Sequence, residues 1–442
     1  MKRLGIVLVL GLVLGTELVA AAAHRDAPQA VAAVSAAEFA ALKRDFAELA
    51  RRFDAMEAEN AQLRAGQAET HRAMARLRSD PATPAAVEPA ASWTDRISLS
   101  GDFRYRYEYT TTDRLGANNP KRNRIRARPV VTARLPADVE VGFGLATGST
   151  DPTSANQTLS EFDQEQDQDI ALDLAYVDWG TPIDGLHLFA GKFKNQFIRA
   201  GNNGLLWDSD WRPEGVKAVY DNDIVFGSLL GNWVQTSDGV GRHEEFSWGA
   251  QGGIRASFGS TKILVGATYF DFPADGNSCY FEMDDCRGNT AVLDPANPGD
   301  FLYAFDYEML EGFLEVDFDA FGLPSQLFVD YVQNDAADSE DTGYAVGLRV
   351  GQTAGQGSWQ ARYHYQDLEA DAVLGLLTDS DMAGGGTDSN GHKLSAAYAF
   401  TDASRINLTY FIAERQDSNG VENGGEAYDV DTLFVDFEWK YK

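Results

Sequence analysis

Apolar and polar side chains alternate with a period of two from residue 93 onward, and no other feature of the chain constrains its fold as strongly. In the run 97–109, for example, the aromatic Phe103 and Tyr105 alternate with the basic Arg104 and Arg106. A period of two sends successive side chains to opposite faces of a β-strand. Sixteen such runs occur between residue 93 and residue 442, and they predict sixteen strands, each with an apolar and a polar face.

The connections between these runs alternate between tight and long. The tight connections are 136–138, 221–223, 259–260, 321–324 and 401–404. The long connections are 110–120, 149–168, 198–214, 273–307, 367–391 and 415–428. Short turns at one end and long loops at the other are typical of membrane barrels, whereas a soluble β-sandwich has no reason to keep that alternation. We therefore predict an all-β transmembrane antiparallel barrel of about 16 strands over residues 93–442.

The N-terminus predicts export. Lys2 and Arg3 precede an apolar stretch from Leu4 to Leu14, and small residues follow up to Ala23. This order is that of a cleavable signal peptide, which we assign to residues 1–23. No later run approaches the roughly 18 apolar residues of a membrane helix. An even number of strands also places both ends of the barrel on the periplasmic side.

The sequence predicts a helical segment before the barrel. Residues 34–79 carry apolar side chains at alternating steps of three and four, as in a coiled coil. These are Phe39, Leu42, Phe46, Leu49, Phe53, Met56, Leu63, Met74 and Leu77. Because no second apolar helix follows, we expect this periplasmic helix to associate with copies of itself. A Pro/Ala-rich linker, residues 80–92, separates it from the barrel.

Energetics decide which face of the barrel strands is wet. An arginine on the lipid face near the membrane centre costs about 2 to 4 kcal/mol, so Arg124, Arg126 and Arg128 must point into a hydrated lumen. The same alternation predicts a larger set of basic residues lining the pore: Arg104, Arg106, Arg124, Arg126, Arg128 and Arg134. A formal net charge of −30 argues against nucleic acid as a partner.

Acidic side chains are predicted to line the lumen about half a turn from the arginines. They are Glu311, Glu315, Asp317 and Asp330. A basic wall facing an acidic wall would create an electric field across the lumen and sort ions. The alternative is that these charges only keep the interior wet and pair with their neighbours.

The sequence contains few residues that suggest a disulfide, a metal site or a catalytic site. Cys279 and Cys286 are seven residues apart in a Gly-, Asn- and Asp-rich connection, and in an exported chain this spacing suggests a disulfide that closes one loop. The six histidines form no metal-binding pair, and no nucleophile elbow or dinucleotide motif is present. Acidic loop residues such as Asp208 and Asp210 do not match the spacing of a calcium loop. We therefore expect no enzyme, no cofactor and no metal.

Several segments together resemble the family of outer-membrane porins in which a coiled coil precedes a β-barrel. They are GDFRYRYE at 101–108, RNRIRAR at 122–128, LATG at 145–148, LAYVDW at 174–179, GKF at 191–193 and WDSDWRPEG at 207–215. The resemblance implies a channel for small hydrophilic solutes in the bacterial outer membrane, in contact with its lipid and assembled as a homotrimer. One departure is the last residue, Lys442, where related barrels end on an aromatic side chain.

Two other functions stay open at this point. The barrel could be an anchor whose coiled coil tethers or spaces the outer membrane, or it could be a channel selective for one solute. The coiled coil is about 63 Å long at 1.5 Å per residue, which is short for a tether. A solute-selective channel requires a narrow binding site, which the sequence alone does not locate.

Overall fold

The computed structural model of the chain describes residues 93–148, 151–160, 169–235, 245–280, 285–418 and 423–442. The predicted signal peptide, coiled coil and linker lie outside these residues.

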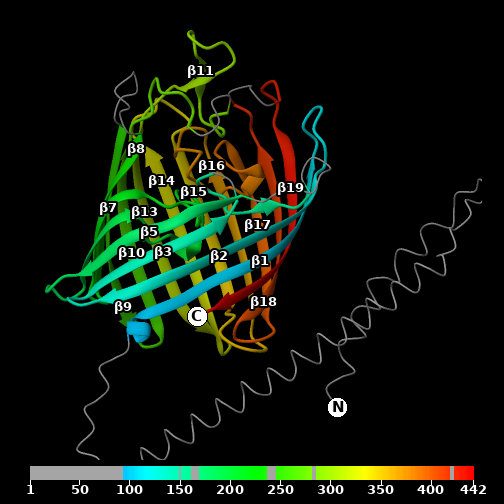
Figure 1. The fold of residues 1–442 in the computed structure, drawn as a ribbon. Coiled ribbons are helices and arrows are strands. Elements are labelled where there is room, and N and C mark those ends of the chain that lie inside the picture. Colours follow the sequence, from blue (N-terminus) through cyan, green and yellow to red (C-terminus); the bar gives the residue numbers. More distant parts are fainter. Residues whose placement is uncertain (1–92, 149–150, 161–168, 236–244, 281–284, 419–422) are drawn as a thin grey trace, which may run out of the picture. The chain divides into compact units, whose positions relative to one another are not determined.

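Sixteen antiparallel strands form a closed barrel, which confirms the predicted fold class (Figure 1). The strands are β1 (Ile97–Thr112), β2 (Lys121–Leu135), β3 (Val139–Thr147), β5 (Ile170–Gly180), β6 (Leu186–Lys192), β7 (Glu214–Asp221), β8 (Val225–Gln235), β9 (Glu245–Phe258), β10 (Thr261–Phe272), β13 (Tyr307–Ala320), β14 (Leu323–Asn334), β15 (Thr342–Gly351), β16 (Trp359–Leu368), β17 (Ser389–Ala399), β18 (Ser404–Arg415) and β19 (Tyr428–Tyr441). Strands β1 and β19 pair from Gly101↔Tyr441 to Thr112↔Val430 and close the barrel.

The long connections contain short β-strands of two or three residues. Strand β4 (Gln157–Thr158) pairs with β2, and β11 (Ala291–Leu293) pairs with β12 (Phe301–Tyr303) in a hairpin. A disulfide joins Cys279 and Cys286 in the same connection as that hairpin, the pair expected from the sequence. Figure 1 places the hairpin at the end of the barrel opposite the start of β1 and the C-terminus. No helix in the described part of the chain has the length and hydropathy to cross a bilayer.

The two faces of each strand differ as the alternation predicts. On β1, Phe103 is 38% exposed, whereas the neighbouring Arg104 is 8% exposed. Large apolar side chains such as Leu229, Ile254 and Leu408 are likewise exposed on the outer face. Hydrocarbon accepts apolar side chains without cost but offers no partner to a charged group, so this arrangement suits a barrel in lipid.

Two long connections fold into the lumen. We call residues 193–213, between β6 and β7, the crossing segment, and residues 369–388, between β16 and β17, the bracing segment. The 3₁₀ turn η4 (Ala200–Asn202) of the crossing segment lies against β13, β14 and β15, nearly across the barrel from β6. The turn η5 (Met382–Gly384) of the bracing segment lies against β17, β18 and β19.

Apolar side chains hold the crossing segment in place. Trp207 stacks on Trp211 with ring centroids 4.9 Å apart, and Phe270 of β10 meets Trp207 edge-on at 4.7 Å. Leu374 and Leu377 of the bracing segment belong to the same buried cluster. Burying such large side chains removes apolar area from water, so these segments are more stable inside the barrel than as exposed loops.

Candidate functional site

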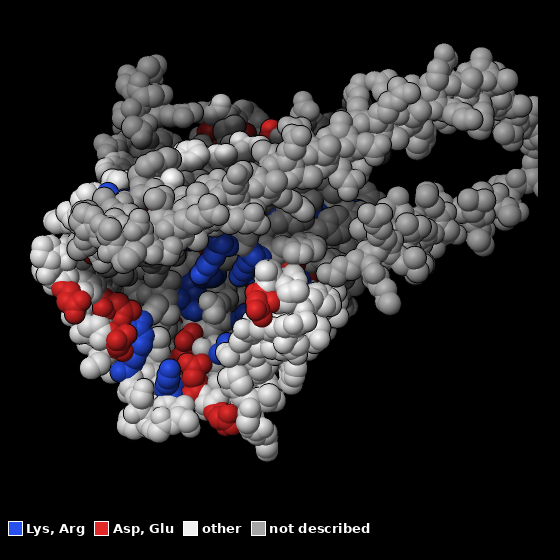
Figure 2. All heavy atoms as spheres, turned by 60° about the horizontal axis from the view of Figure 1, so that its bottom comes forward, with Lys and Arg blue, Asp and Glu red and all other residues white. Residues whose placement is uncertain are grey.

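Basic side chains of β1 and β2 line one side of the lumen. Figure 2 looks into the end of the barrel where β1 begins and β19 ends, and it shows Lys and Arg side chains deep in a hollow. Arg104, Arg106 and Arg126 are each less than a tenth exposed. Alternation along two neighbouring strands positions them in one layer, because Arg104 lies directly opposite Arg126 and Arg106 opposite Arg124 in the sheet register.

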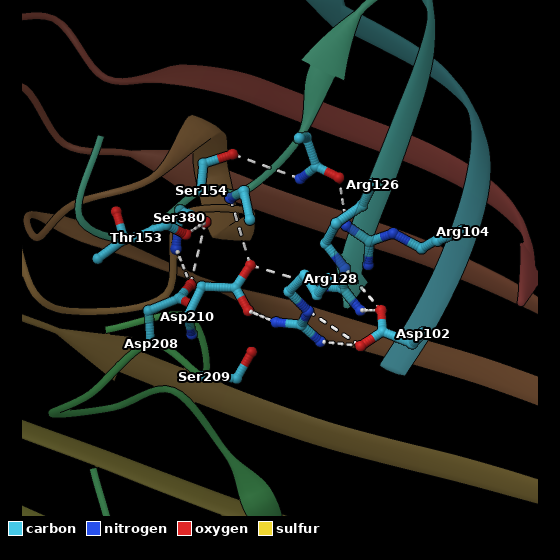
Figure 3. A network of polar contacts seen from close by, with 12 residues as sticks. Asp102, Arg104, Arg126, Arg128, Thr153, Ser154, Asp208, Ser209, Asp210 and Ser380 are labelled. Carbon is cyan, nitrogen blue, oxygen red and sulfur yellow. Dashed lines mark hydrogen bonds and ion pairs between the residues drawn. The ribbon is translucent and has the colours of Figure 1, made fainter. Parts of the chain in front are cut away.

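Carboxylates compensate most of this charge. Arg126 and Arg128 both contact Asp102 of β1, at 3.0 and 2.9 Å, and both contact Asp210 of the crossing segment, at 3.5 and 2.6 Å (Figure 3). A carboxylate held by two guanidinium groups is a strong, directional contact. The pair of arginines therefore fastens the crossing segment to the barrel wall.

The neighbouring arginines have partners of their own. Arg106 contacts Asp436 of β19 at 2.7 Å and Asp381 of the bracing segment at 3.3 Å. Arg124 contacts Glu108 at 3.3 Å. Arg134 differs from the rest of the predicted basic set, because its side chain is 83% exposed near the β2–β3 turn and is 3.9 Å from Glu140. It lies at the rim and outside the layer formed by the other arginines.

The sequence pattern predicts that all four acidic residues face water, but two of them are covered by other parts of the protein. Glu311 and Asp330 are about 2% and 1% exposed beneath the crossing segment. Thr268 donates its hydroxyl to Glu311, and the Asn203 side-chain amide donates to Asp330 at 2.7 Å. Their alternation along the strands is as predicted, but the segment that covers them comes from another part of the chain.

The other two acidic residues also have local partners. Glu315 accepts a hydrogen bond from the backbone N–H of Gly201 at 2.6 Å, so it anchors the turn η4. Asp317 lies 3.4 Å from Arg349 of β15. The carboxylates that face the arginine layer are instead Asp210 and Asp381, from the two segments inside the lumen.

Asp208 and Asp210 are two residues apart but sit in opposite electrostatic environments. Burial raises the pKa of Asp208 to about 7, and the neighbouring Asp210 and Asp379 add to the effect. Burial alone would also raise the pKa of Asp210, but Arg126 and Arg128 more than offset it and lower that pKa below its usual range. Asp210 therefore stays charged at neutral pH, whereas Asp208 is only partly ionised there.

The bracing segment holds Asp208 in place. Ser380 donates to its carboxylate through the hydroxyl at 3.0 Å and through the backbone N–H at 3.1 Å. The backbone N–H of Asp208 donates to the Leu377 carbonyl at 2.7 Å. The N–H of Asp379 donates to the Gly204 carbonyl at 3.0 Å. The two segments are thus hydrogen-bonded to each other inside the lumen, and we call the place where they meet the constriction.

Two cavities meet at this constriction. A loop-end cavity of about 630 Å³ is lined by residues near the long connections, such as Asp151 and Tyr280. A turn-end cavity of about 550 Å³ is lined by residues at the opposite end of the strands, such as Gly101 and Lys440. Both cavities are lined by Asp173, Asp210 and Arg212.

Asp173 and Arg212 form a nearly buried ion pair at this meeting point, with Arg212 Nε 3.0 Å from an Asp173 oxygen. Neither residue is among the pore-lining residues predicted from the sequence, and Asp208, Asp210 and Asp381 are also absent from that set. A signal for the crossing segment does exist in the sequence: Phe197, Leu205, Leu206, Trp207 and Trp211 make this long connection too apolar for an exposed loop.

A family model described as "Putative porin" matches residues 115–279 and 299–441, well over half of the chain. The chain belongs to this porin family. The expected function, an outer-membrane channel for the passive diffusion of solutes, is confirmed at that level. The barrel, its constriction and the cavities on both sides of it are the physical form of such a channel.

The fold is shared with one solved porin structure, and a second is reported for comparison. Pseudomonas putida OprB, in its high pH structure, superposes with a TM-score of 0.52 at 11% identity, over 80% of this chain and 96% of that one. Salmonella typhi OmpF in complex with daunomycin gives a TM-score of 0.47 at 11% identity, over 78% of this chain and 97% of that one. A search among curated proteins returns no match.

Proposed function

We propose that small hydrophilic solutes cross this porin through the two cavities and pass Asp173, Asp210 and Arg212 on the way, and that anions are favoured over cations. The observation that carries the proposal is the set of three residues shared by two cavities at opposite ends of the barrel. Charged groups at the narrowest part of a route act on solutes most strongly, because little water screens them there.

The charge of the turn-end cavity supports the anion preference. Its lining includes eight basic and four acidic side chains, although the chain as a whole carries a formal net charge of −30. A cavity that concentrates positive charge between low-dielectric walls raises the local concentration of anions. The field we propose across the lumen runs from the arginine layer to Asp210 and Asp381, in place of the acidic wall expected from the sequence.

Reversal potentials in planar bilayers test this proposal. We expect open-channel steps and a preference for chloride over potassium in the unmodified porin. Changing Arg124, Arg126 and Arg128 together to Gln should shift the reversal potential toward cation preference. Arg255→Gln is the matched control, because Arg255 pairs with Asp221 at an exposed position and lines neither cavity.

Other outcomes would refute the anion preference or favour the membrane-anchor alternative. An unmodified channel that prefers cations, or an unchanged ion preference in the triple variant, would refute the anion proposal. Electrical silence of protein that shows the β-sheet spectrum of a folded barrel would favour the membrane-anchor alternative.

We further propose a homotrimer, for which the barrel wall offers one supporting feature. Strand β5 continues through residues 170–174 beyond its last pair with β6, at Ala175↔Lys192. The loop-end cavity is lined there by Leu172 of β5 and Trp233 of β8, on either side of the place where the chain turns into the lumen. A second copy could cover this gap, and the predicted periplasmic coiled coil of residues 34–79 would add a second contact.

Light scattering of the full chain in detergent tests the assembly. We expect the mass of three chains. Leu172→Asp, at the gap, should lower the mass toward that of one chain, whereas Leu327→Asp, on the outer face of β14, should not. The two leucines are similarly exposed, at 47% and 41%. A monomeric unmodified chain would refute the trimer.

A further inference from the structure

We propose that Arg104 forms a binding subsite for small organic carboxylates in the turn-end cavity, so that the channel recognises such solutes as well as admitting them. This inference rests on the proposed route through that cavity. It goes beyond a general anion preference, because it names one side chain and predicts saturable binding.

Arg104 is the member of the arginine layer that makes no ion pair of its own among the described residues, and Asp436 and Asp381 act on its charge only from beyond ion-pair distance. Its side chain lines the cavity and is more than nine-tenths buried. Its Nη2 donates to the side-chain oxygen of Asn156 at 2.5 Å, and Asn156 is neutral. Within the described ranges, no carboxylate lies within ion-pair distance of Arg104, and its Nε has no hydrogen-bond acceptor.

The sheet register explains why Arg104 has no carboxylate partner. Its two cross-strand neighbours are Arg126 of β2 and Glu438 of β19. Arg126 repels it. Glu438 is already held by Arg405 at 2.6 Å and by Asn407 at 2.7 Å. Burying a charge without a direct ion-pair partner is unfavourable, and an anion from solution would offset that cost.

A second cation lines the same cavity. Lys194 lies at the start of the crossing segment, and no ion pair of its ammonium group occurs among the described residues. Burial lowers its pKa, and the nearby Arg212 and Arg128 lower it further. A bound anion would reverse that effect, so Lys194 and Arg104 both favour a negative ligand in this cavity.

The neighbouring contacts indicate a carboxylate more than a phosphate. Arg126 and Arg128 already hold two carboxylates of the protein, Asp102 and Asp210, in the same layer. A guanidinium fork matches the planar geometry of a carboxylate. A doubly charged phosphate would meet stronger repulsion from Asp102, Asp173 and Asp210, which line the same cavity.

Saturation-transfer NMR with sodium propionate as the probe, on the folded full chain in deuterated detergent, tests the subsite. We expect saturable binding to the unmodified porin and at least a tenfold loss of affinity in Arg104→Gln. Arg255→Gln, which removes an arginine outside both cavities, should bind propionate as the unmodified porin does. Lys194→Gln should weaken binding about threefold and serves as the test if Arg104→Gln does not fold.

Three outcomes would overturn the proposal: no saturable binding to the unmodified porin, an unchanged affinity in both cavity variants, or equal competition by inorganic phosphate at the same concentration. Because the assay needs no current, it separates the subsite from the channel. A conducting porin without propionate binding would refute the subsite alone. Propionate binding by a porin that conducts no current would leave the subsite standing and refute the proposed route.

Discussion

Nη1 of Arg128 lies 2.6 Å from Oδ1 of Asp210, and this ion pair joins strand β2 of the wall to the segment that crosses the lumen. Both side chains are largely buried, and Arg126 contacts the same aspartate. The position of the constriction therefore depends on a small number of charged groups, and changes to these groups should have measurable effects.

Replacing Asp210 by Asn should lower the free energy of unfolding by about 3 kcal/mol, because it leaves two buried guanidinium groups, Arg126 and Arg128, with Asp102 as their one shared carboxylate. The matched control is Asp221→Asn, which breaks an exposed pair with Arg255 and should cost less than about 1 kcal/mol. Urea unfolding in lipid vesicles, followed by tryptophan fluorescence, gives both values. Equal costs would show that Asp210 does not hold the crossing segment.

Asp208 should make the constriction less stable as the pH rises. Its folded-state pKa of about 7 lies above the unfolded value near 4, so its contribution to stability is complete below about pH 4 and is lost as the pH rises through 7. Asp208→Asn, which stays neutral, should reduce the loss of stability between pH 5 and pH 8, as measured by urea midpoints. The same pH dependence in both proteins would contradict this assignment.

A cysteine at Ser209 should report on the proposed route. Ser209 is exposed and lines the turn-end cavity beside Asp210, and the two native cysteines are joined to each other and do not react. Modification of Ser209→Cys with a negatively charged thiol reagent should reduce the single-channel conductance by half or more. Ser260→Cys, in the exposed β9–β10 turn, is the control and should conduct as before. Unchanged conductance of fully modified Ser209→Cys would place the route elsewhere.

Removing the disulfide should affect one outer connection and leave conduction unchanged. The bond closes a short loop, for which the chain-entropy model gives roughly 2 kcal/mol, and neither cysteine lines the loop-end or the turn-end cavity. We expect the variant with both Cys279 and Cys286 changed to Ser to be cleaved faster by trypsin after Arg287, at an unaltered conductance. The unmodified porin under reducing conditions should behave in the same way, and an equal cleavage rate in all samples would show that the disulfide does not order this connection.

The wall of the barrel could be predicted from the sequence because its rules are local. A period of two assigns Arg104 and Arg126 to the lumen and Phe103 to the outer face, and the cost of an arginine in hydrocarbon fixes the sign of that assignment. The alternation of tight and long connections then distinguishes a membrane barrel from a sandwich. None of these arguments needs contacts between distant parts of the chain.

The constriction could not be predicted in the same way, because it depends on which segments meet inside the barrel. Periodicity assigned Glu311 and Asp330 to the inner face, but it carries no information on the crossing segment that covers them. Likewise, the contact between Ser380 and Asp208 spans more than 170 residues and has no local pattern. The apolar side chains around Trp207 indicated a buried connection, although not the partners it would find.

The division of the chain into a wall and two inserted segments has a consequence for how such channels can change. Strand register and outward apolar side chains determine the diameter of the barrel. The opening at the constriction is set by a few side chains on connections that are not part of the β-sheet. Substitutions between residues 205 and 212 could therefore narrow, widen or recharge the opening while the cylinder is inherited unaltered, so that new permeabilities can arise without a new fold.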